Sequence, residues 1–268
     1  MWTSWVGIEP GTRIRTNKLK VLLRKPLAPY KGLRCGCAPG THEALVEMIC
    51  RHVPPCSGVL DIGAHAGALL LRLRETGYSD LAGTDLDTTL FALPEAEFKR
   101  LELNQPFSNA FTRKFTLITC TDVIEHLDSP RNFLSESREL LEEGGWLALS
   151  LPNVAYWEGR WKFMLKGELW GFGKRNYQTQ RHISPITFEQ MAMMLQEIGF
   201  ELVESGSGGS FATMLRNIVT FPLWGLLRLI GGRNVLGESA LFLARKAKPQ
   251  QELKSPTDYR KRWSGIPD

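Results

Sequence analysis

Two acids and two glycines in the first half of the chain have types and a spacing that could bind a small ligand. Asp61, Gly63 and Gly67 fall in the run Asp-Ile-Gly-Ala-His-Ala-Gly, directly after a short apolar segment. Glycine lets a backbone turn tightly and come close to a ligand. Asp85 ends the next apolar segment, 18 residues beyond Gly67. A carboxylate there can accept hydrogen bonds from both hydroxyls of a ribose, so the pattern predicts an adenosine-containing ligand.

The glycine spacing separates two kinds of adenosine ligand. A nicotinamide dehydrogenase uses G-x-G-x-x-G, which lets a pyrophosphate rest on a helix N-terminus. Here His65 stands two residues after Gly63, and the next glycine is Gly67, four residues after it. An acid, Asp61, stands two residues before the first glycine. The resulting D-x-G-x-x-x-G is close to the D/E-x-G-x-G-x-G of class I methyltransferases.

The elements that must position these residues alternate between strands and helices. Short apolar strands are predicted over 58–62, 81–85, 115–120, 146–151, 200–204 and 239–246. Predicted helices cover 41–52 and 68–75, a segment from the capping pair Ser129-Pro130 to Gly144-Gly145, and a segment from the capping box at Thr187 to Gly199. This alternation predicts a parallel, doubly wound α/β sheet. Ligands of such sheets bind at the carboxyl ends of the strands.

Several sequence blocks together resemble a known family. They are "VLDIGAHAG", "GTDLD", "FTLITCTDVIEHL", "LLEEGGWLALSLPN" and "RHISPITFEQMAMMLQEIGFELVE". In order and spacing they resemble class I S-adenosylmethionine-dependent methyltransferases, in particular the bacterial group that includes the ubiquinone-biosynthesis O-methyltransferases. The likeness covers roughly 41–204 and the final strand. It implies a seven-stranded Rossmann-like sheet with an antiparallel last strand and a methyltransferase domain over 41–246.

The resemblance also implies a role for individual residues toward S-adenosylmethionine. Asp61, Gly63 and Gly67 would line the methionine part of the cofactor, and Asp85 would hold its ribose. The remaining implied contacts are Leu86 on the adenine, Glu102 and Leu103 at the adenine edge, and Thr121 near the amino-acid end.

The chain departs from the family pattern at three positions. His65 replaces the middle glycine of the loop, Glu102 replaces an Asp, and Thr116 replaces the Asp before the fourth strand. The side chain of His65 stands where backbone usually approaches the cofactor. It is the best support for the alternative function, a non-catalytic S-adenosylmethionine-binding regulatory or scaffold protein.

Two histidines are the candidate catalytic residues. His126 follows the fourth predicted strand, where substrate-facing groups lie, and His182 precedes the capping box at Thr187. A histidine near its ordinary pKa of ~6.5 could accept a proton from an acceptor hydroxyl. Methyl transfer from a sulfonium is an in-line displacement, for which positioning can do most of the work. We expect a small-molecule, glycan or lipid-like acceptor, methylated at oxygen.

Nucleic acid is not the expected acceptor. Adenine N6 enzymes carry an Asp/Asn-Pro-Pro-aromatic motif after the fourth strand, where this chain has Thr121-Asp122-Val123-Ile124. Cytosine-C5 enzymes of RNA need a nucleophilic Cys near the active loops, whereas Cys120 falls inside a predicted strand. These motifs are therefore absent from the sequence.

Two segments could determine the acceptor. An insertion over 153–182 is rich in aromatic and cationic side chains and would form an acceptor lid, with Trp161 and His182 facing the acceptor; a surface helix packed on the sheet is the alternative. A second apolar stretch, 211–230, is interrupted by Arg216, Pro222 and Arg228. It could make a peripheral membrane contact, cover a hydrophobic acceptor or pack as a core helix.

The ends of the chain are basic and its middle is acidic. Residues 1–34 hold eight Lys/Arg and one acid, and we expect 1–40 to be a loosely attached basic arm and 247–268 a flexible tail. No leader segment or membrane span is apparent, which predicts a cytoplasmic protein. Four of the five cysteines fall within 35–56 near His42 and His52. Their spacing lacks a C-x2-C pair, so no metal is expected.

Overall fold

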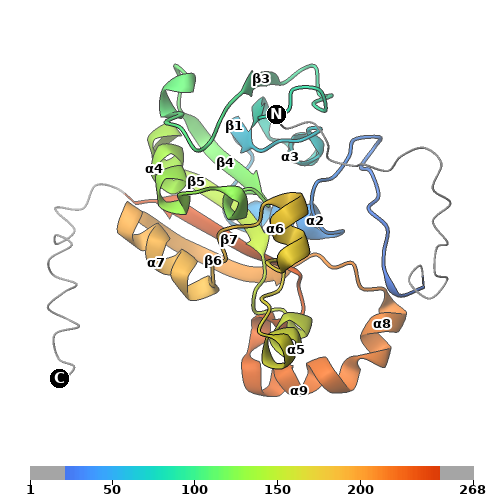
Figure 1. Cartoon of the computed structure of the whole chain (residues 1–268). Helices are drawn as coiled ribbons and strands as arrows, with labels where there is room; N and C mark the ends of the chain where they lie inside the picture. Colours follow the sequence, from blue (N-terminus) through green and yellow to red (C-terminus); the bar gives the residue numbers. More distant parts are fainter. Residues whose placement is uncertain (1–21, 248–268) are drawn as a thin grey trace, which may run out of the picture.

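Residues 22–247 are described by the structure, which is a computed structural model (Figure 1). Their seven strands form one sheet in the order β3-β2-β1-β4-β5-β7-β6. Adjacent strands are parallel except at β7, which is antiparallel to both β5 and β6. The bounds are β1 Ser57–Ile62, β2 Ser79–Asp85, β3 Glu97–Arg100, β4 Phe115–Thr121, β5 Leu141–Pro152, β6 Phe200–Gly208 and β7 Ser239–Lys246. The predicted doubly wound seven-stranded sheet with an antiparallel last strand is confirmed.

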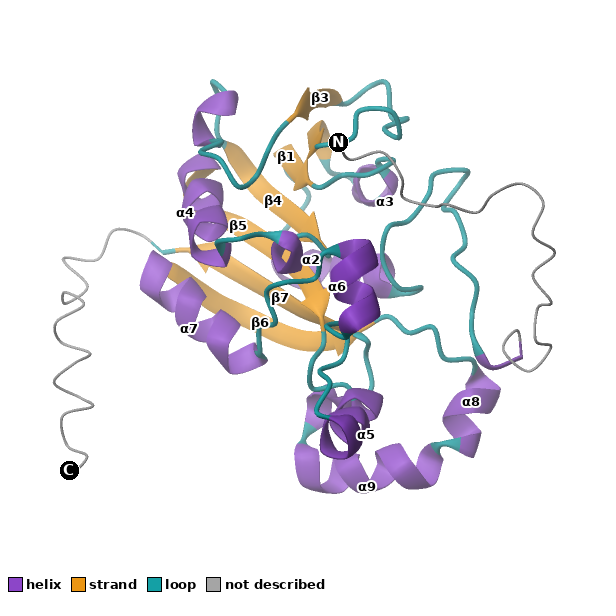
Figure 2. Ribbon diagram, viewed as in Figure 1, coloured by secondary structure: helices purple, strands orange, loops and turns teal. Residues whose placement is uncertain are grey.

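Helices cover both faces of the sheet (Figure 2). Alternate residues of a strand point to opposite faces, and in β1 Leu60 and Ile62 join one buried cluster while Val59 joins the other. Helices α4 and α7 complete the first cluster, and α2 and α3 complete the second. The bounds are α2 Thr41–His52, α3 Ala68–Glu75, α4 Pro130–Leu140, α5 Trp157–Lys166, α6 Lys174–Gln180, α7 Phe188–Ile198, α8 Met214–Val219 and α9 Phe221–Gly231.

The capping signals position two helices as predicted. The Ser129 side chain accepts a hydrogen bond from the amide of Asn132 at the start of α4. At α7, the Thr187 side chain accepts from the amide of Gln190, and the Gln190 side chain accepts from the amide of Thr187. Both pairs satisfy amides that a helix start leaves without a partner.

One helix end and one strand differ from the prediction. Helix α4 ends at Leu140, and β5 begins at once at Leu141, so Gly144 and Gly145 lie inside the strand. The β4–β5 register shifts between Phe115 and Leu117, and glycines suit such an irregularity. Strand β3 was not predicted, because three of its four residues are charged, Phe98 is its only apolar residue, and it lies at the sheet edge.

The segment before α2 is packed more closely than a loose arm. Tyr30 lies under the Arg72 guanidinium of α3, 3.6 Å from ring centroid to Cζ, and Lys31 pairs with Glu75 at 2.6 Å. Cys37 is buried. The prediction of loose attachment is therefore wrong for residues 30–40, because α3 offers a cation and a carboxylate to them. The rest of the predicted arm, 1–21, and the tail from 248 on lie outside the described residues.

Within residues 22–247, no helix is long and apolar enough to cross a membrane.

Candidate functional site

The carboxyl ends of three neighbouring strands bring the predicted site residues together. Strand β1 pairs with β2 on one side and β4 on the other, so Ile62 lies opposite both Thr84 and Cys120. Sequence order reverses at β1, which is the switch point of the sheet, and ligands of open α/β sheets bind there. Asp61, Asp85 and Thr121 therefore meet at one edge.

The first glycine of the loop makes room for the segment that follows β4. Gly63 has a φ of 78°, and its amide donates to the carbonyl of Thr84 at 2.8 Å. A Cβ on Gly63 would lie 2.2 Å from Cγ2 of Val123. No side chain fits between the two loops, so only glycine allows this close approach.

The last glycine of the loop begins α3. Gly67 caps the helix with a φ of 87°. A Cβ there would lie 3.1 Å from Cβ of Leu93 and 3.2 Å from the ring of Phe91. The loop after β2 thus closes over Gly67, and the turn from β1 into α3 stays tight.

His65 does not fill the loop in which it replaces a glycine. Its φ of 49° is left-handed, a conformation that histidine adopts at a modest cost. The backbone amide donates to Oδ2 of Asp85 at 2.9 Å. The ring lies against Gly36 of the segment before α2. The backbone therefore keeps the turn that a glycine would make, while the side chain points to the N-terminal segment.

Asp85 is held in a fixed orientation at the end of β2. Oδ2 accepts from the amide of His65, and Oδ1 accepts from the amide of Asp87 at 3.0 Å. A carboxylate oxygen can accept a second hydrogen bond. Both oxygens of Asp85 can therefore still bind a pair of ligand hydroxyls.

Asp61 is a buried acid beside this pair. Its Oδ1 accepts from the Thr119 hydroxyl at 2.7 Å. The pKa of Asp61 is raised to about 7: burial is the main cause, the Thr119 hydrogen bond opposes it, and the nearby charge of Asp85 adds a smaller increase. A cationic ligand group would favour the charged form of Asp61, since an opposite charge lowers the pKa of an acid.

Polar atoms without partners surround a small cavity at the loop. The cavity, about 20 Å³, has room for one water molecule. Nδ1 of His42, Nδ1 of His65 and Oγ1 of Thr121 are buried without a hydrogen-bond partner. The lining residues are Arg34, Gly36, Cys37, His42, Asp61, Gly63, Ala64, His65, Ala68 and Thr121. Unpaired polar atoms around Gly63 fit a polar ligand. The cavity is too small for a ligand the size of methionine, so residues 34–37, which form one wall, would have to move to admit it.

The residues predicted for the adenine lie next to Asp85. The amide of Leu101, just after β3, donates to the carbonyl of Asp85 at 3.2 Å, so Glu102 and Leu103 follow at the same edge. Leu86 is half-buried, and its carbonyl accepts from Arg100. Glu102 is exposed, whereas Leu103 packs on the core.

The two candidate histidines lie in contact with each other. The rings of His126 and His182 meet edge to face with centroids 4.8 Å apart. The amides of Ile183 and Ser184 donate to the carbonyl of Glu125 at 2.9 and 3.0 Å. These bonds tie the end of the insertion to the loop after β4, close to Val123.

The same loop holds an acid that sequence reasoning did not place in the site. Both carboxyl oxygens of Glu125 are buried without a hydrogen-bond partner. Burial raises the pKa of Glu125 well above its usual range, and the charge of Asp122 adds to the effect. Within 22–247, Glu125, His126 and His182 form the one group of three metal-ligating side chains, with ligand atoms within 4.8 Å of one another. A carboxylate and two imidazoles could hold a divalent transition ion.

Other residues at the site were also missed from the sequence. Arg34, Cys37 and His42 line the small cavity, but they belong to a stretch that the sequence interprets as an arm and the first helix. Asp122 is half-buried, and its partial removal from water raises its pKa to about 6. Its position directly after β4 was the available signal.

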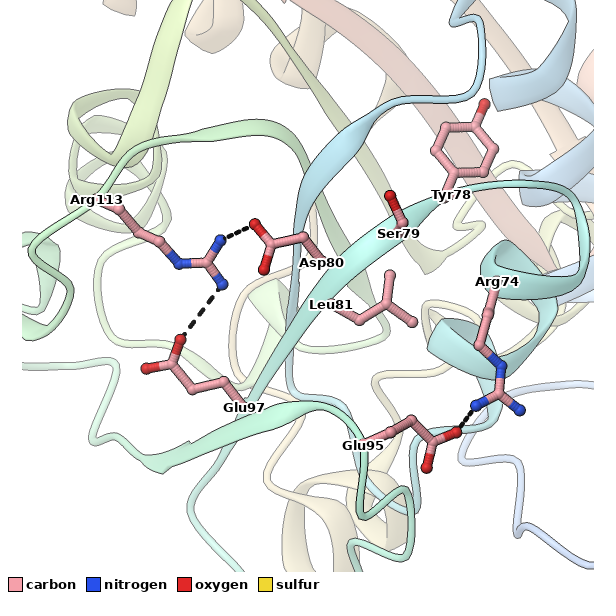
Figure 3. A pocket seen from close by; sticks show the side chains of 8 residues that line it. All are labelled: Arg74, Tyr78, Ser79, Asp80, Leu81, Glu95, Glu97 and Arg113. Carbon is pink, nitrogen blue, oxygen red and sulfur yellow. Dashed lines mark hydrogen bonds and ion pairs between the residues drawn. The ribbon is translucent and has the colours of Figure 1, made fainter.

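A second cavity among the described residues lies at the opposite end of the strands. It measures about 610 Å³ and opens beside the first residues of β2 and β3. Figure 3 shows that its charged side chains pair among themselves, Arg113 with Asp80 and Glu97, and Arg74 with Glu95. No carboxyl end of a strand lies there, and its charges are already paired, so we assign it no ligand.

The strand order, the antiparallel β7 and the acid-flanked glycine turn define the fold of the class I S-adenosylmethionine-dependent methyltransferases. A model of the methyltransferase domain family matches residues 33–205. Because this match covers more than half of the chain, the chain belongs to that family. The chain therefore carries a methyltransferase domain.

Individual relatives share only part of the sequence. A ubiquinone biosynthesis O-methyltransferase of Glaesserella parasuis is 33% identical over 107 residues, covering 35% of this chain and 45% of that protein. The mitochondrial ubiquinone biosynthesis O-methyltransferase of Candida albicans is 30% identical over 105 residues, covering 35% and 32%. The matched part thus spans less than half the length of these curated relatives.

Solved structures share the fold. A S-adenosylmethionine-dependent methyltransferase of Archaeoglobus fulgidus aligns with a TM-score of 0.53 at 16% identity, over 77% of this chain and 95% of that one. The cyclase SpnF aligns with a TM-score of 0.51 at 15% identity, over 77% and 80%. Because a cyclase has the same architecture, the acceptor and the reaction details must be argued from the site.

The contact between Gly63 and Val123 gives a stability prediction. Gly63→Ala should destabilise the fold by about 1–3 kcal/mol or more, because the methyl group clashes and the backbone is left-handed. Adding Val123→Ala should recover part of this loss. Urea unfolding of both single variants and the double variant measures the coupling. Gly32→Ala is the control, since Gly32 has a φ of 88° and nothing within 4 Å of a Cβ. Additive losses would show that the two side chains do not compete.

Proposed function

We propose that the chain transfers the methyl group of S-adenosylmethionine to a hydroxyl oxygen of a small-molecule, glycan or lipid-like acceptor, with His182 as the base. The observation that carries the proposal is the contact between His126 and His182 beside the loop that packs on Gly63. The ubiquinone biosynthesis O-methyltransferases to which the chain is similar support oxygen as the acceptor atom.

Several residues would hold the cofactor. Asp85 would accept from the ribose hydroxyls, and Asp61 would accept from the amino group at the methionine end. The other contacts would come from the backbone of Gly63 and Gly67, the side chains of Leu86, Glu102 and Leu103, and Thr121. The unpaired hydroxyl of Thr121 and the open lone pairs of Asp85 fit these roles.

The tautomer of His182 suits a base. Its Nδ1 lies 2.7 Å from the carbonyl of Gly171, which can only accept, so Nδ1 carries the proton. Nε2 is then the nitrogen that can accept a proton. Burial lowers the pKa of His182 to about 4, with a smaller effect from His126. At neutral pH the imidazole is therefore uncharged.

The transfer step needs little more than position and a proton acceptor. The cofactor supplies a methyl group on a sulfonium sulfur. The acceptor hydroxyl would lose its proton as its oxygen is methylated, and Nε2 of His182 would accept that proton. Alignment of the reacting atoms can contribute ~7–11 kcal/mol. His126, whose ring supports that of His182, would position the base.

The insertion divides into two parts with different surroundings. Residues 171–184 border the histidines, since Phe172 lies 5.6 Å from the His182 ring and backbone groups of Gln180 and Arg181 contact His126. Trp161 of α5 instead packs in an aromatic cluster with α9. We therefore propose that residues 171–182 contact the acceptor, and we no longer assign Trp161 to it.

The cofactor assignment predicts a loss of affinity in Asp85→Ala. The substitution leaves two ligand hydroxyls unpaired and frees the amides of His65 and Asp87, and each lost hydrogen bond to a charged group costs about 1.5–3 kcal/mol. The dissociation constant for S-adenosylmethionine in isothermal titration calorimetry should rise at least tenfold. Glu95→Ala, an exposed acid at the far edge, should leave it unchanged. An unaltered constant in Asp85→Ala would refute the ribose assignment.

The base assignment predicts both a loss of turnover and a particular pH profile. His182→Ala should lower kcat by about 10²–10⁴ while the dissociation constant for S-adenosylmethionine stays the same. A panel of phenols, catechols and hydroxylated lipids provides the acceptor for the assay. The active, neutral form of His182 exists above its pKa, so the rate should fall only as the pH drops toward about 4.

Two results would contradict this role. An acid limb near pH ~6.5, the ordinary histidine value, would mean that His182 is not desolvated in the working enzyme. Full activity in His182→Ala would exclude it as the base. Loss of activity on adding a chelator would instead assign Glu125, His126 and His182 to a metal ion.

A further inference from the structure

One end of the molecule exposes a concentration of large apolar side chains. Figure 2 shows α5, α8 and α9 gathered beside one another, away from the helices that cover the sheet. Leu229 and Ile230 of α9 are 85% and 74% exposed, and Met214 of α8 is 79% exposed. We call this surface the apolar end; it consists of Phe163, Met164, Leu165, Met214, Leu215, Ile218, Val219, Phe221, Leu223, Leu226, Leu229 and Ile230.

The inner sides of these helices are well packed, so the outward direction of the apolar end is fixed. Trp161, Trp224 and Leu227 pack against a buried cluster of Tyr156, Trp157 and Val235. Arg216 of α8 forms an ion pair with Glu158 of α5. Nε1 of Trp224 donates to the carbonyl of Asn217 at 2.9 Å, which joins α9 to α8. The exposed side chains are therefore the outer face of a packed unit.

The charges around the apolar end are almost all positive. The sequence has no acid between Glu204 and Glu238, and residues 157–181 hold six Lys/Arg against two Glu. Both of those glutamates, Glu158 and Glu168, already pair with cations. Lys166 and Arg228 are exposed among the apolar side chains.

The described end of the basic N-terminal segment adds to this charge. The amide of Lys25 donates to the carbonyl of Phe211 at 2.6 Å, and the guanidinium of Arg24 lies 4.2 Å from the centre of the Phe211 ring. Thr213, which caps α8, donates its hydroxyl to the carbonyl of Leu22. The exposed cations of this segment are thus anchored at the start of α8.

We propose that the apolar end docks the protein on an anionic lipid bilayer. Contiguous exposed apolar patches mark interaction sites. An aqueous protein partner of opposite charge would need acids, whereas a bilayer with anionic headgroups matches both the apolar side chains and the flanking cations. The helices have six to eleven residues, which is too short to span a bilayer but suits a position in its interface.

Docking here would present the active site to the membrane. Helix α5 belongs to the same insertion whose other end, at Gly171 and His182, borders the candidate base. An acceptor dissolved in the bilayer would then reach the site without crossing water. The docking itself does not depend on the acceptor, so a failure of the proposed function leaves it to be judged separately.

Vesicle sedimentation of the full chain tests the proposal. Wild-type protein should bind vesicles of phosphatidylglycerol and phosphatidylcholine more strongly than vesicles of phosphatidylcholine alone. The double variant Leu229→Glu/Ile230→Glu should bind the anionic vesicles at least tenfold more weakly, because two charges would enter the apolar layer. The matched control Met193→Glu/Val203→Glu changes two exposed apolar residues outside the apolar end and should bind like wild type.

Thermal unfolding by circular dichroism should show the same melting temperature for both double variants and the wild type, since all four residues are exposed. Absence of wild-type binding to anionic vesicles, or equal loss in the two double variants, would overturn the proposal. So would a wild-type dimer in light scattering that Leu229→Glu/Ile230→Glu dissociates, because the apolar end would then contact a second copy.

Discussion

The pairing of β1 with β2 on one side and with β4 on the other is the constraint on which the whole site depends. Parallel pairing aligns the carboxyl ends, and the order of strands reverses at β1. The chain leaving β1 must therefore turn at once into α3, and the chain leaving β4 must pass over that turn. Gly63 meets Val123 at this crossing. The positions of the candidate residues, from Asp85 to His182, follow from this strand pairing.

Burial of acids is the main electrostatic property of this edge. Asp61 and Glu125 are buried and Asp122 is half-buried, and removal from water raises the pKa of each. A buried carboxylate is costly unless it meets a positive charge or a hydrogen-bond donor. S-adenosylmethionine brings a sulfonium and an ammonium group. The cationic cofactor could therefore stabilise charge on acids that the free protein holds close to neutrality.

The sequence predicted those parts that local chemistry determines. Glycines in left-handed turns, the capping box of Thr187 and alternating apolar strands each depend on near neighbours in the chain. Asp61 and Asp85 could be assigned to one site from the sequence, because the carboxyl ends of parallel strands lie at the same edge of the sheet. The tight turn after β1 was predicted although His65 replaces a glycine, since its backbone adopts a left-handed conformation there.

The parts that were missed depend on contacts between distant segments. The packing of Tyr30 on α3 and of Gly36 on His65 involves residues far apart in the chain, and residues 30–37 alone do not predict it. Strand β3 forms because its backbone can pair with the otherwise unpaired side of β2. The grouping of the buried Glu125 carboxyl with His126 and His182, and the packing of α5 against α9, likewise arise only when the insertion folds back. Hydrophobic periodicity carries no information on such contacts.

The most direct test of the account is a calorimetric titration of S-adenosylmethionine at a pH near 6.5, in two buffers with different heats of ionisation. In the free protein the pKa of Asp61 is about 7, so most molecules carry the proton. Binding of the cofactor's ammonium group should lower that pKa and release the proton. We expect proton release in the wild type and less in Asp61→Asn. Binding without proton release would contradict the placement of the cofactor at Asp61.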